Sequence, residues 1–290
     1  MSLNVAETQK VLFDLLIYFD EICKKHDILY WIDGGTLLGA KRYEKFIPWD
    51  DDIDVCVLQE DYDKIVAVFQ EEVPKTKNYV LYNSARHKPH FTEYLGDCTT
   101  LKGGNKMPVQ IDIIRVKKIH NTEESIAKDK RMVNLFKYYL HKPYDPEMNK
   151  GFEEEKFIID KNFKKRPLFY QYFINDYLNS LPTEGKDLLY NYAYNASYVS
   201  KERPYYVEDD MFPLSTITFE GKEFPCPHNV DSYLTKLYGE NYMQPPPKDK
   251  QLPSSPKSIK NIFPRFITKK WIYFIYFLKE IKNNQRMKKK

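Results

Sequence analysis

The chain contains 290 residues, of which 42% are hydrophobic and 30% are charged. These fractions are typical of a soluble globular protein, and the length allows a substantial core in one large domain or two smaller ones. The net charge of +4 is too small to indicate nucleic acid as a partner. The four cysteines are widely spaced and lack the paired spacing of a zinc site. Cys56 lies in a predicted buried strand, where a free thiol behaves as a small apolar group, so we expect a reducing compartment.

No segment of the sequence resembles a membrane-spanning helix or a secretory leader. A span needs roughly 20 consecutive apolar residues, and the N-terminal residues show no basic region followed by an apolar stretch. We therefore expect a cytoplasmic protein that is at most attached peripherally to the inner face of the cell membrane.

The first part of the chain alternates between helical and strand patterns. Apolar side chains recur at helical spacing from Val11 to Cys23, which predicts an amphipathic helix. The elements predicted after it are a strand at 28–32, a helix at 36–42, a strand at 52–58, a helix at 61–72, strands at 79–82 and 91–98, and a strand at 109–116. This order predicts an α/β unit with a mixed sheet.

Beyond about residue 120 the sequence changes to long helical patterns rich in Phe, Tyr, Lys and Leu. Helices are predicted over 123–141, 153–181 and 185–196, followed by a hairpin at 217–224 and a short helix at 230–238 that ends at Gly239. No internal repeat or sharp linker interrupts this part, so we expect it to pack on the first part.

A glycine pair lies near the start of the most informative stretch, residues 31–57, which reads WIDGGTLLGAKRYEKFIPWDDDIDVCV. Gly34 and Gly35 turn the chain into a helix, and backbone N–H groups at a helix N-terminus bind phosphate. Thr36 either bonds a phosphate oxygen or caps the helix. Arg42 either complements the dipole at the end of this helix or clamps a diphosphate.

Carboxylates follow within an apolar strand pattern. Asp52 and Asp54 are two residues apart, so in a strand both side chains project to the same face. Asp112 lies in the middle of the apolar strand 109–116 and is the natural third ligand if the two strands are neighbours. Burying carboxylates is costly unless a cation binds them, and Mg²⁺ or Mn²⁺ prefers such oxygen ligands. The pattern therefore predicts a metal-dependent site for a phosphate-bearing substrate.

Two other interpretations of the acidic stretch fit less well. A calcium-binding helix–loop–helix starting at Asp50 needs glycine at its sixth position and glutamate at its twelfth, where this chain has Val55 and Asp61. A solvated acidic loop or helix cap is disfavoured because apolar residues flank and interrupt the carboxylates.

Residues 34–55 resemble the signature of the LicD family of phosphotransferases, which includes the fukutin-related enzymes. The matching sequence is GGTLLGAKRYEKFIPWDDDIDV. Two further segments are similar to family motifs in the same order, QIDI at 110–113 and FEGKEFPCPHNVDSYLTKLYGENYMQPPP at 219–247. The chain departs from the pattern at Tyr43 and at 248–251, where many members carry a histidine.

This resemblance implies a nucleotidyltransferase-like α/β fold, with a mixed sheet, flanking helices and a helical, aromatic-rich C-terminal half. It also implies transfer of phosphocholine, or a related phospho-alcohol, from a CDP-linked donor such as CDP-choline to a hydroxyl of a cell-surface glycan, with release of CMP. Lipopolysaccharide and teichoic acid are both candidate acceptors. The site residues that the resemblance assigns are the catalytic, Mg²⁺- or Mn²⁺-binding Asp52, Asp54 and Asp112 and the substrate-binding Gly34, Gly35, Thr36 and Arg42.

The expected organisation has three parts. A nucleotidyltransferase-like catalytic core spans 1–120, a helical and hairpin region at 121–260 packs on it and completes the substrate site, and a basic, aromatic tail occupies 261–290. The apolar run of this tail is too short to span a bilayer. The tail either lies on an anionic lipid surface as a basic helix or docks on the core.

Two other functions are compatible with parts of this pattern. A nucleotidyltransferase would use the same metal chemistry to attack the α-phosphorus of a nucleoside triphosphate and would release pyrophosphate. A catalytically inactive partner protein would only bind glycan or membrane, and the presence of all three aspartates argues against it.

Overall fold

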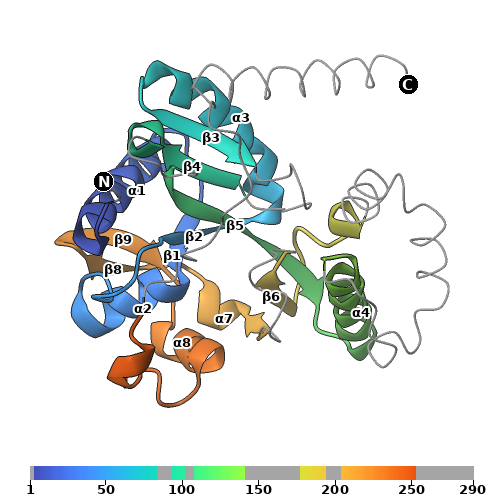
Figure 1. Cartoon of the computed structure of the whole chain (residues 1–290). Helices are drawn as coiled ribbons and strands as arrows, with labels where there is room; N and C mark the ends of the chain where they lie inside the picture. Colours follow the sequence, from blue (N-terminus) through green and yellow to red (C-terminus); the bar gives the residue numbers. More distant parts are fainter. Residues whose placement is uncertain (1–2, 84–92, 102–107, 141–176, 194–203, 253–290) are drawn as a thin grey trace.

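The computed structural model describes residues 3–83, 93–101, 108–140, 177–193 and 204–252 (Figure 1). The helices are α1 (Val5–Lys25), α2 (Gly34–Tyr43), α3 (Tyr62–Glu72), α4 (Glu123–Leu140), α7 (Glu208–Met211) and α8 (Val230–Tyr238). The strands are β1 (Tyr30–Asp33), β2 (Asp54–Leu58), β3 (Tyr79–Asn83), β4 (Glu93–Asp97), β5 (Val109–His120), β6 (Leu188–Tyr192), β7 (Tyr206–Val207), β8 (Ser215–Phe219) and β9 (Lys222–Cys226). This composition confirms the predicted α/β class.

Seven of these strands form one mixed sheet. Its main path runs β1-β2-β5-β4-β3, and β6 and β7 extend it from β5. The β2–β5 pair is parallel and the other pairs are antiparallel. The 12-residue β5 pairs with β4 through 109–113 and with β6 through 116–120, so it links the first half of the chain to the second.

Different halves of the chain cover the two faces of this sheet. On one face, Phe19 of α1 packs against Tyr30 of β1 and Phe69 of α3, with ring centroids 5.0 and 5.1 Å away. On the other face, Trp31 of β1 contacts Phe212, with centroids 6.0 Å apart. The second half therefore packs on the sheet face that carries the odd-numbered side chains of β1. Its β8–β9 hairpin also packs against α1, where the rings of Phe219 and Phe224 each lie 6.3 Å from that of Phe13.

Most helix predictions in the first half of the chain are confirmed, because capping residues and apolar periodicity there indicate the same elements. Asn4 and Glu7 form a capping box at the start of α1, which then buries one apolar stripe in the core. α3 and the strands β1 to β5 also lie at the expected places, with boundary shifts of a few residues. β2, however, begins at Asp54, so Asp52 precedes the strand.

The helix predicted over 185–196 is wrong. Residues 188–192 instead form β6, and every residue of that strand is buried. Tyr190 and Tyr192 recur at the two-residue period of a strand, and pairing with β5 and β7 satisfies the backbone. The predicted helix at 153–181 lies mostly outside the described residues.

The hairpin and final helix of the second half are confirmed. β8 and β9 pair around a turn at Glu220 and Gly221, whose φ angles are 51° and 76°, as in the tight turns that suit a twisted hairpin. α8 ends at Tyr238 and is capped by Gly239, which has a φ of 90°. Within the residues that the structure describes, no helix is long and apolar enough to cross a membrane.

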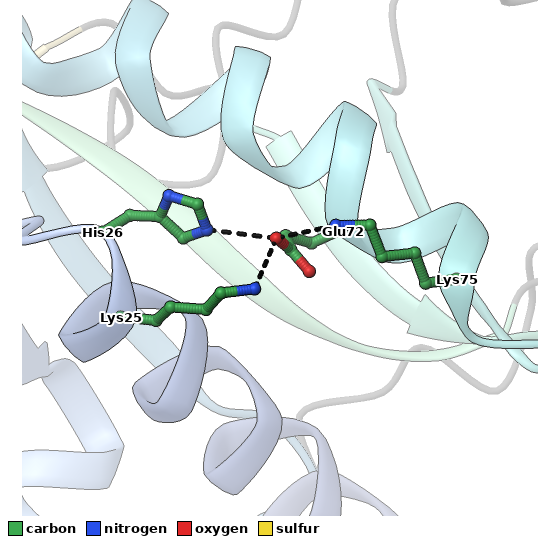
Figure 2. Close-up of polar contacts among 4 residues, drawn as sticks. All are labelled: Lys25, His26, Glu72 and Lys75. Atoms are coloured by element: carbon green, nitrogen blue, oxygen red, sulfur yellow. Dashed lines mark hydrogen bonds and ion pairs between the residues drawn. The ribbon is translucent and has the colours of Figure 1, made fainter.

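An ion-pair cluster joins the ends of α1 and α3 (Figure 2). Oε1 of Glu72 lies 2.8 Å from Nζ of Lys25, 3.1 Å from Nε2 of His26 and 2.9 Å from Nζ of Lys75. The hydrogen bond from Lys25, followed by those from Lys75 and His26, lowers the pKa of Glu72 to about 2.

A fully buried ion pair joins α4 to β5. Nζ of Lys117 lies 3.2 Å from Oδ2 of Asp129, and both side chains are 0% exposed. The hydroxyl groups of Tyr177 and Tyr205 donate to Asp129 at 3.0 Å each, while Lys117 also donates to the carbonyl of Tyr192 at 2.8 Å. These bonds supply partners to charges that would otherwise be costly to bury.

Candidate functional site

Three carboxylates lie in one row across β1, β2 and β5. In the strand register, Asp33 is opposite Asp54 and Asp54 is opposite Asp112. Residues directly opposite each other project from the same face of a sheet, and neighbouring strands are about 4.8 Å apart. The strands that carry Asp54 and Asp112 are therefore neighbours, as a shared ligand role for the two residues requires, and Asp33 is an additional member of the row.

Asp52 approaches Asp112 from the segment that precedes β2. Burial and, second, the negative charge of Asp52 raise the pKa of Asp112 to about 7. Burial is also the main cause that raises the pKa of Asp52, while a hydrogen bond with Asp50 opposes that shift. The two carboxylates therefore repel each other where water screens them poorly.

The glycine pair makes room for carboxylates. A Cβ atom at Gly34 would lie 2.6 Å from Oδ2 of Asp54, and a Cβ atom at Gly35 would lie 2.5 Å from Oδ2 of Asp50. Any larger residue would collide with these oxygens. Gly34 also has a φ of 55°, a conformation that favours glycine. The structure thus gives the pair a packing role that the sequence analysis missed.

Thr36 connects the first turn of α2 to the start of β2. Its Oγ1 accepts a hydrogen bond from the backbone N–H of Asp54 at 3.1 Å, and the residue is 3% exposed. This bond holds the acidic strand against the helix N-terminus. It brings Thr36 together with Gly34 and Asp54 at the same edge of the sheet.

Arg42 contacts the C-terminal segment. Its Nη2 donates to the carbonyl groups of Tyr242 and Gln244, the latter at 3.0 Å. Nζ of the neighbouring Lys41 lies 2.9 Å from Oδ1 of Asp231 on α8. The end of α2 therefore anchors α8 and the residues after it, and Arg42 is engaged there rather than extended toward the glycine pair.

The carboxylates fit a divalent cation only in part. Asp52 and Asp112 repel each other, and oxygen ligands of this kind are those that Mg²⁺ prefers. However, no group of three His, Cys, Asp or Glu side chains among the described residues is arranged to hold a metal ion. The structure thus brings Asp52 close to Asp112, whereas the carboxylate of Asp54 packs against Gly34.

Asp33 is a buried residue of this region that the sequence analysis missed. It is 0% exposed, its Oδ1 accepts a hydrogen bond from the Tyr233 hydroxyl at 2.8 Å, and its Oδ2 accepts one from the Cys56 thiol at 3.2 Å. The hydroxyl groups of Tyr233 and Tyr192 lie 2.9 Å apart. The available signal was a carboxylate that directly follows the apolar strand predicted at 28–32.

Comparison with known proteins identifies the domain that carries this site. Residues 27–146 match the family model described as LicD/FKTN/FKRP, nucleotidyltransferase domain. Lipopolysaccharide cholinephosphotransferase LicD of Haemophilus influenzae is 29% identical over 270 residues, which cover 87% of this chain and 96% of that protein. Ribitol 5-phosphate transferase FKRP of mouse and of human is 50% identical over 34 residues, 12% of this chain and 7% of FKRP.

Proposed function

Because the chain belongs to the LicD family, we propose that it transfers a substituted phosphate group to a glycan. The group would be phosphocholine or a related phospho-alcohol, the donor its CDP derivative, and the acceptor a hydroxyl of a cell-surface glycan. The names of the relatives support this proposal, since one moves phosphocholine to lipopolysaccharide and the other moves ribitol 5-phosphate.

In the proposed reaction, the acceptor hydroxyl oxygen attacks the phosphorus that bears the alcohol. A new oxygen–phosphorus bond forms as the bond from that phosphorus to the bridging oxygen breaks, and CMP leaves with the electron pair. Asp112 receives the hydroxyl proton. The positive charge of a bound cation would favour the ionised form of Asp112, which is the form that accepts a proton.

The other site residues bind and orient the donor in this proposal. Asp52 and Asp112 would hold Mg²⁺ or Mn²⁺, which supplies positive charge against the phosphate oxygens. Asp54 would join them only after its carboxylate leaves Gly34. Gly34, Gly35 and Thr36 would lie beside the phosphate groups at the start of α2.

Arg42 would contact the donor only after releasing the carbonyl groups of Tyr242 and Gln244.

The observation that carries the proposal is that Asp54 and Asp112 lie opposite each other on neighbouring parallel strands, inside the segment that matches the family domain. The negative charge of Asp52 also acts on Asp112. Closely placed carboxylates and a positioned phosphate are the parts that phosphoryl transfer needs, since such catalysis depends mainly on positioning and on neutralising charge.

A panel of CDP-alcohols tests the proposal. The protein is incubated with Mg²⁺, a glycan acceptor and CDP-choline, CDP-ethanolamine, CDP-ribitol or CDP-glycerol, and CMP is quantified by mass spectrometry. We expect metal-dependent CMP release with one donor, at least 100-fold lower in Asp112→Asn and unchanged in Asp97→Asn, a carboxylate of β4 that bonds the N–H of Thr99.

Two outcomes of that panel would contradict the proposal. Pyrophosphate released from CTP, without CMP from any CDP-alcohol, would identify a nucleotidyltransferase. Neither turnover nor metal-dependent binding of a CDP-alcohol would identify a catalytically inactive binding protein.

A further inference from the structure

We propose that Gln9 and Glu220 are positioning residues for the carboxylates of the site. They act on the acidic loop, defined as residues 44–53, which connects α2 to β2. Both lie outside residues 27–146, the segment that matches the family domain. Their catalytic consequence rests on the proposed function, whereas their effect on the loop does not.

Gln9 holds the acidic loop from α1. Its Nε2 donates hydrogen bonds to the carbonyl oxygen of Ile47 at 3.2 Å and to that of Asp50 at 2.8 Å. A side-chain amide has two N–H groups, so one residue serves both acceptors. The contact crosses from the first helix to a loop about 40 residues later, and both bonds are partly buried.

The two acceptors of Gln9 are the first and last carbonyls of a tight turn. The backbone N–H of Asp50 donates to the carbonyl of Ile47 at 2.9 Å, with Pro48 and Trp49 between them. Proline suits the second position of such a turn because its φ is already fixed. Gln9 therefore fixes the direction in which the chain leaves the turn, immediately before Asp52.

Glu220 holds the beginning of the acidic loop from the β8–β9 turn. Its backbone N–H donates to the carbonyl of Glu44 at 2.8 Å, and its Oε1 accepts from the backbone N–H of Phe46 at 3.1 Å. These bonds join the hairpin to the loop at two points. Phe46 also packs against Phe219, with ring centroids 4.8 Å apart.

Gly39 of α2 allows the acidic loop to lie close to that helix. A Cβ atom at Gly39 would lie 2.6 Å from the carbonyl oxygen of Lys45 and 3.0 Å from the backbone nitrogen of Ile47. The loop therefore runs directly over the surface of α2. Contacts with α2, Gln9 and Glu220 therefore restrict the backbone of the acidic loop from Glu44 to Asp50.

The position of the acidic loop matters because the loop delivers Asp50 and Asp52. The Oδ2 of Asp50 lies against Gly35, and Asp52 lies close enough to Asp112 to raise its pKa. A shift of about 1 Å at a reacting group can lower a rate about 100-fold. The hydrogen bonds of Gln9 and Glu220 go to backbone groups of the loop, so both residues would act on the carboxylates through that backbone.

The test for Gln9 uses an isosteric change. Gln9→Glu places a carboxylate against two carbonyl oxygens, while Gln9→Ala only removes the hydrogen-bond donor. Ala6→Glu is the control, because it adds the same charge at an exposed position of α1. We expect faster hydrogen–deuterium exchange at the amides of Phe46 and Asp50, and a kcat lowered 10- to 100-fold in Gln9→Glu with little change in donor KM.

The test for Glu220 depends on the hydrogen bond that its side chain accepts from the backbone N–H of Phe46. The Oε1 of Glu220 only accepts a hydrogen bond, so Glu220→Gln should keep the loop and the activity, and Glu220→Ala should lose both. Glu223→Ala removes a carboxylate that bonds Thr218 on the same hairpin and should behave as the wild type.

Thermal unfolding separates positioning from general destabilisation. The inference requires lower kcat and faster loop exchange at an unchanged melting temperature. Hydrogen–deuterium exchange as slow as in the wild type in both Gln9→Glu and Glu220→Ala would overturn the inference, and so would faster exchange with an unchanged kcat.

If the wild-type protein shows no turnover, the proposed function has failed. The positioning role is then tested by exchange of the loop amides and by the affinity for Mn²⁺, measured by electron paramagnetic resonance. If Gln9→Glu does not fold, Gln9→Ala is measured in its place.

Discussion

Oδ2 of Asp54 lies 2.6 Å from the point that a Cβ atom of Gly34 would occupy, so the glycine and the carboxylate fit together as one unit. Asp54 and Asp33 face each other across β1 and β2, and Gly34 follows Asp33 directly. The start of α2 and the start of β2 are consequently fixed to each other, and a change at either one should move the other.

Gly34→Ala should displace the Asp54 carboxylate and strain the backbone, because the residue has a φ of 55°. We expect a loss of stability of about 1–3 kcal/mol and at least 100-fold lower transferase activity, measured by urea unfolding and CMP release. Gly221→Ala provides the control, since its φ is 76° and a Cβ atom there would meet nothing within 4 Å. Equal loss of activity in both variants would contradict the role of the contact with Asp54.

Asp112 should make the stability of the metal-free protein depend on pH. Its pKa is raised to about 7 in the folded chain, compared with about 4 when unfolded. The folded state therefore binds the proton more tightly, and this contribution to stability is lost as the pH rises from about 4 to about 7.

Urea unfolding in EDTA at pH 5 and at pH 8 checks this expectation. Asp112→Asn should lose less stability than the wild type over that interval. Parallel pH dependences of the two proteins would exclude a raised pKa at Asp112.

Glu72 should make stability depend on pH in the opposite direction to Asp112, because its pKa is lowered and not raised. Hydrogen bonds from Lys25, Lys75 and His26 lower its pKa to about 2, so its contribution is complete above the unfolded value of about 4.3 and is lost as the pH falls toward 2. Glu72→Gln should lower the melting temperature at pH 7, with a smaller difference at pH 3. Glu71→Gln, at the exposed neighbouring position, should change neither value.

The buried pair of Lys117 and Asp129 should show strong coupling. Asp129→Leu leaves the Lys117 charge buried without its ion-pair partner and should cost about 3–5 kcal/mol. Adding Lys117→Met should recover much of that loss, because an apolar pair needs no compensation. A double-mutant cycle by chemical denaturation measures the coupling, and additive losses would contradict it.

The local sequence was enough to predict the elements around the site. The capping residues and apolar stripe of α1, the glycine pair that opens α2 and the Glu220–Gly221 turn are each determined by neighbours within a few residues. Such signals depend on backbone preference and side-chain periodicity, which act over short distances. The helix predicted at 185–196 failed because strand pairing with β5 overrode its helical composition.

The tertiary structure decided how these elements meet. Asp33 and Tyr233 form a hydrogen bond although they are 200 residues apart, and Arg42 binds carbonyl groups of the C-terminal segment. Neither contact has a local signal, because each depends on how α8 and the segment after it pack against β1 and α2. The sequence by itself determined that carboxylates and glycines lie at the start of β2 and α2, and only the packed fold decided which of them touch.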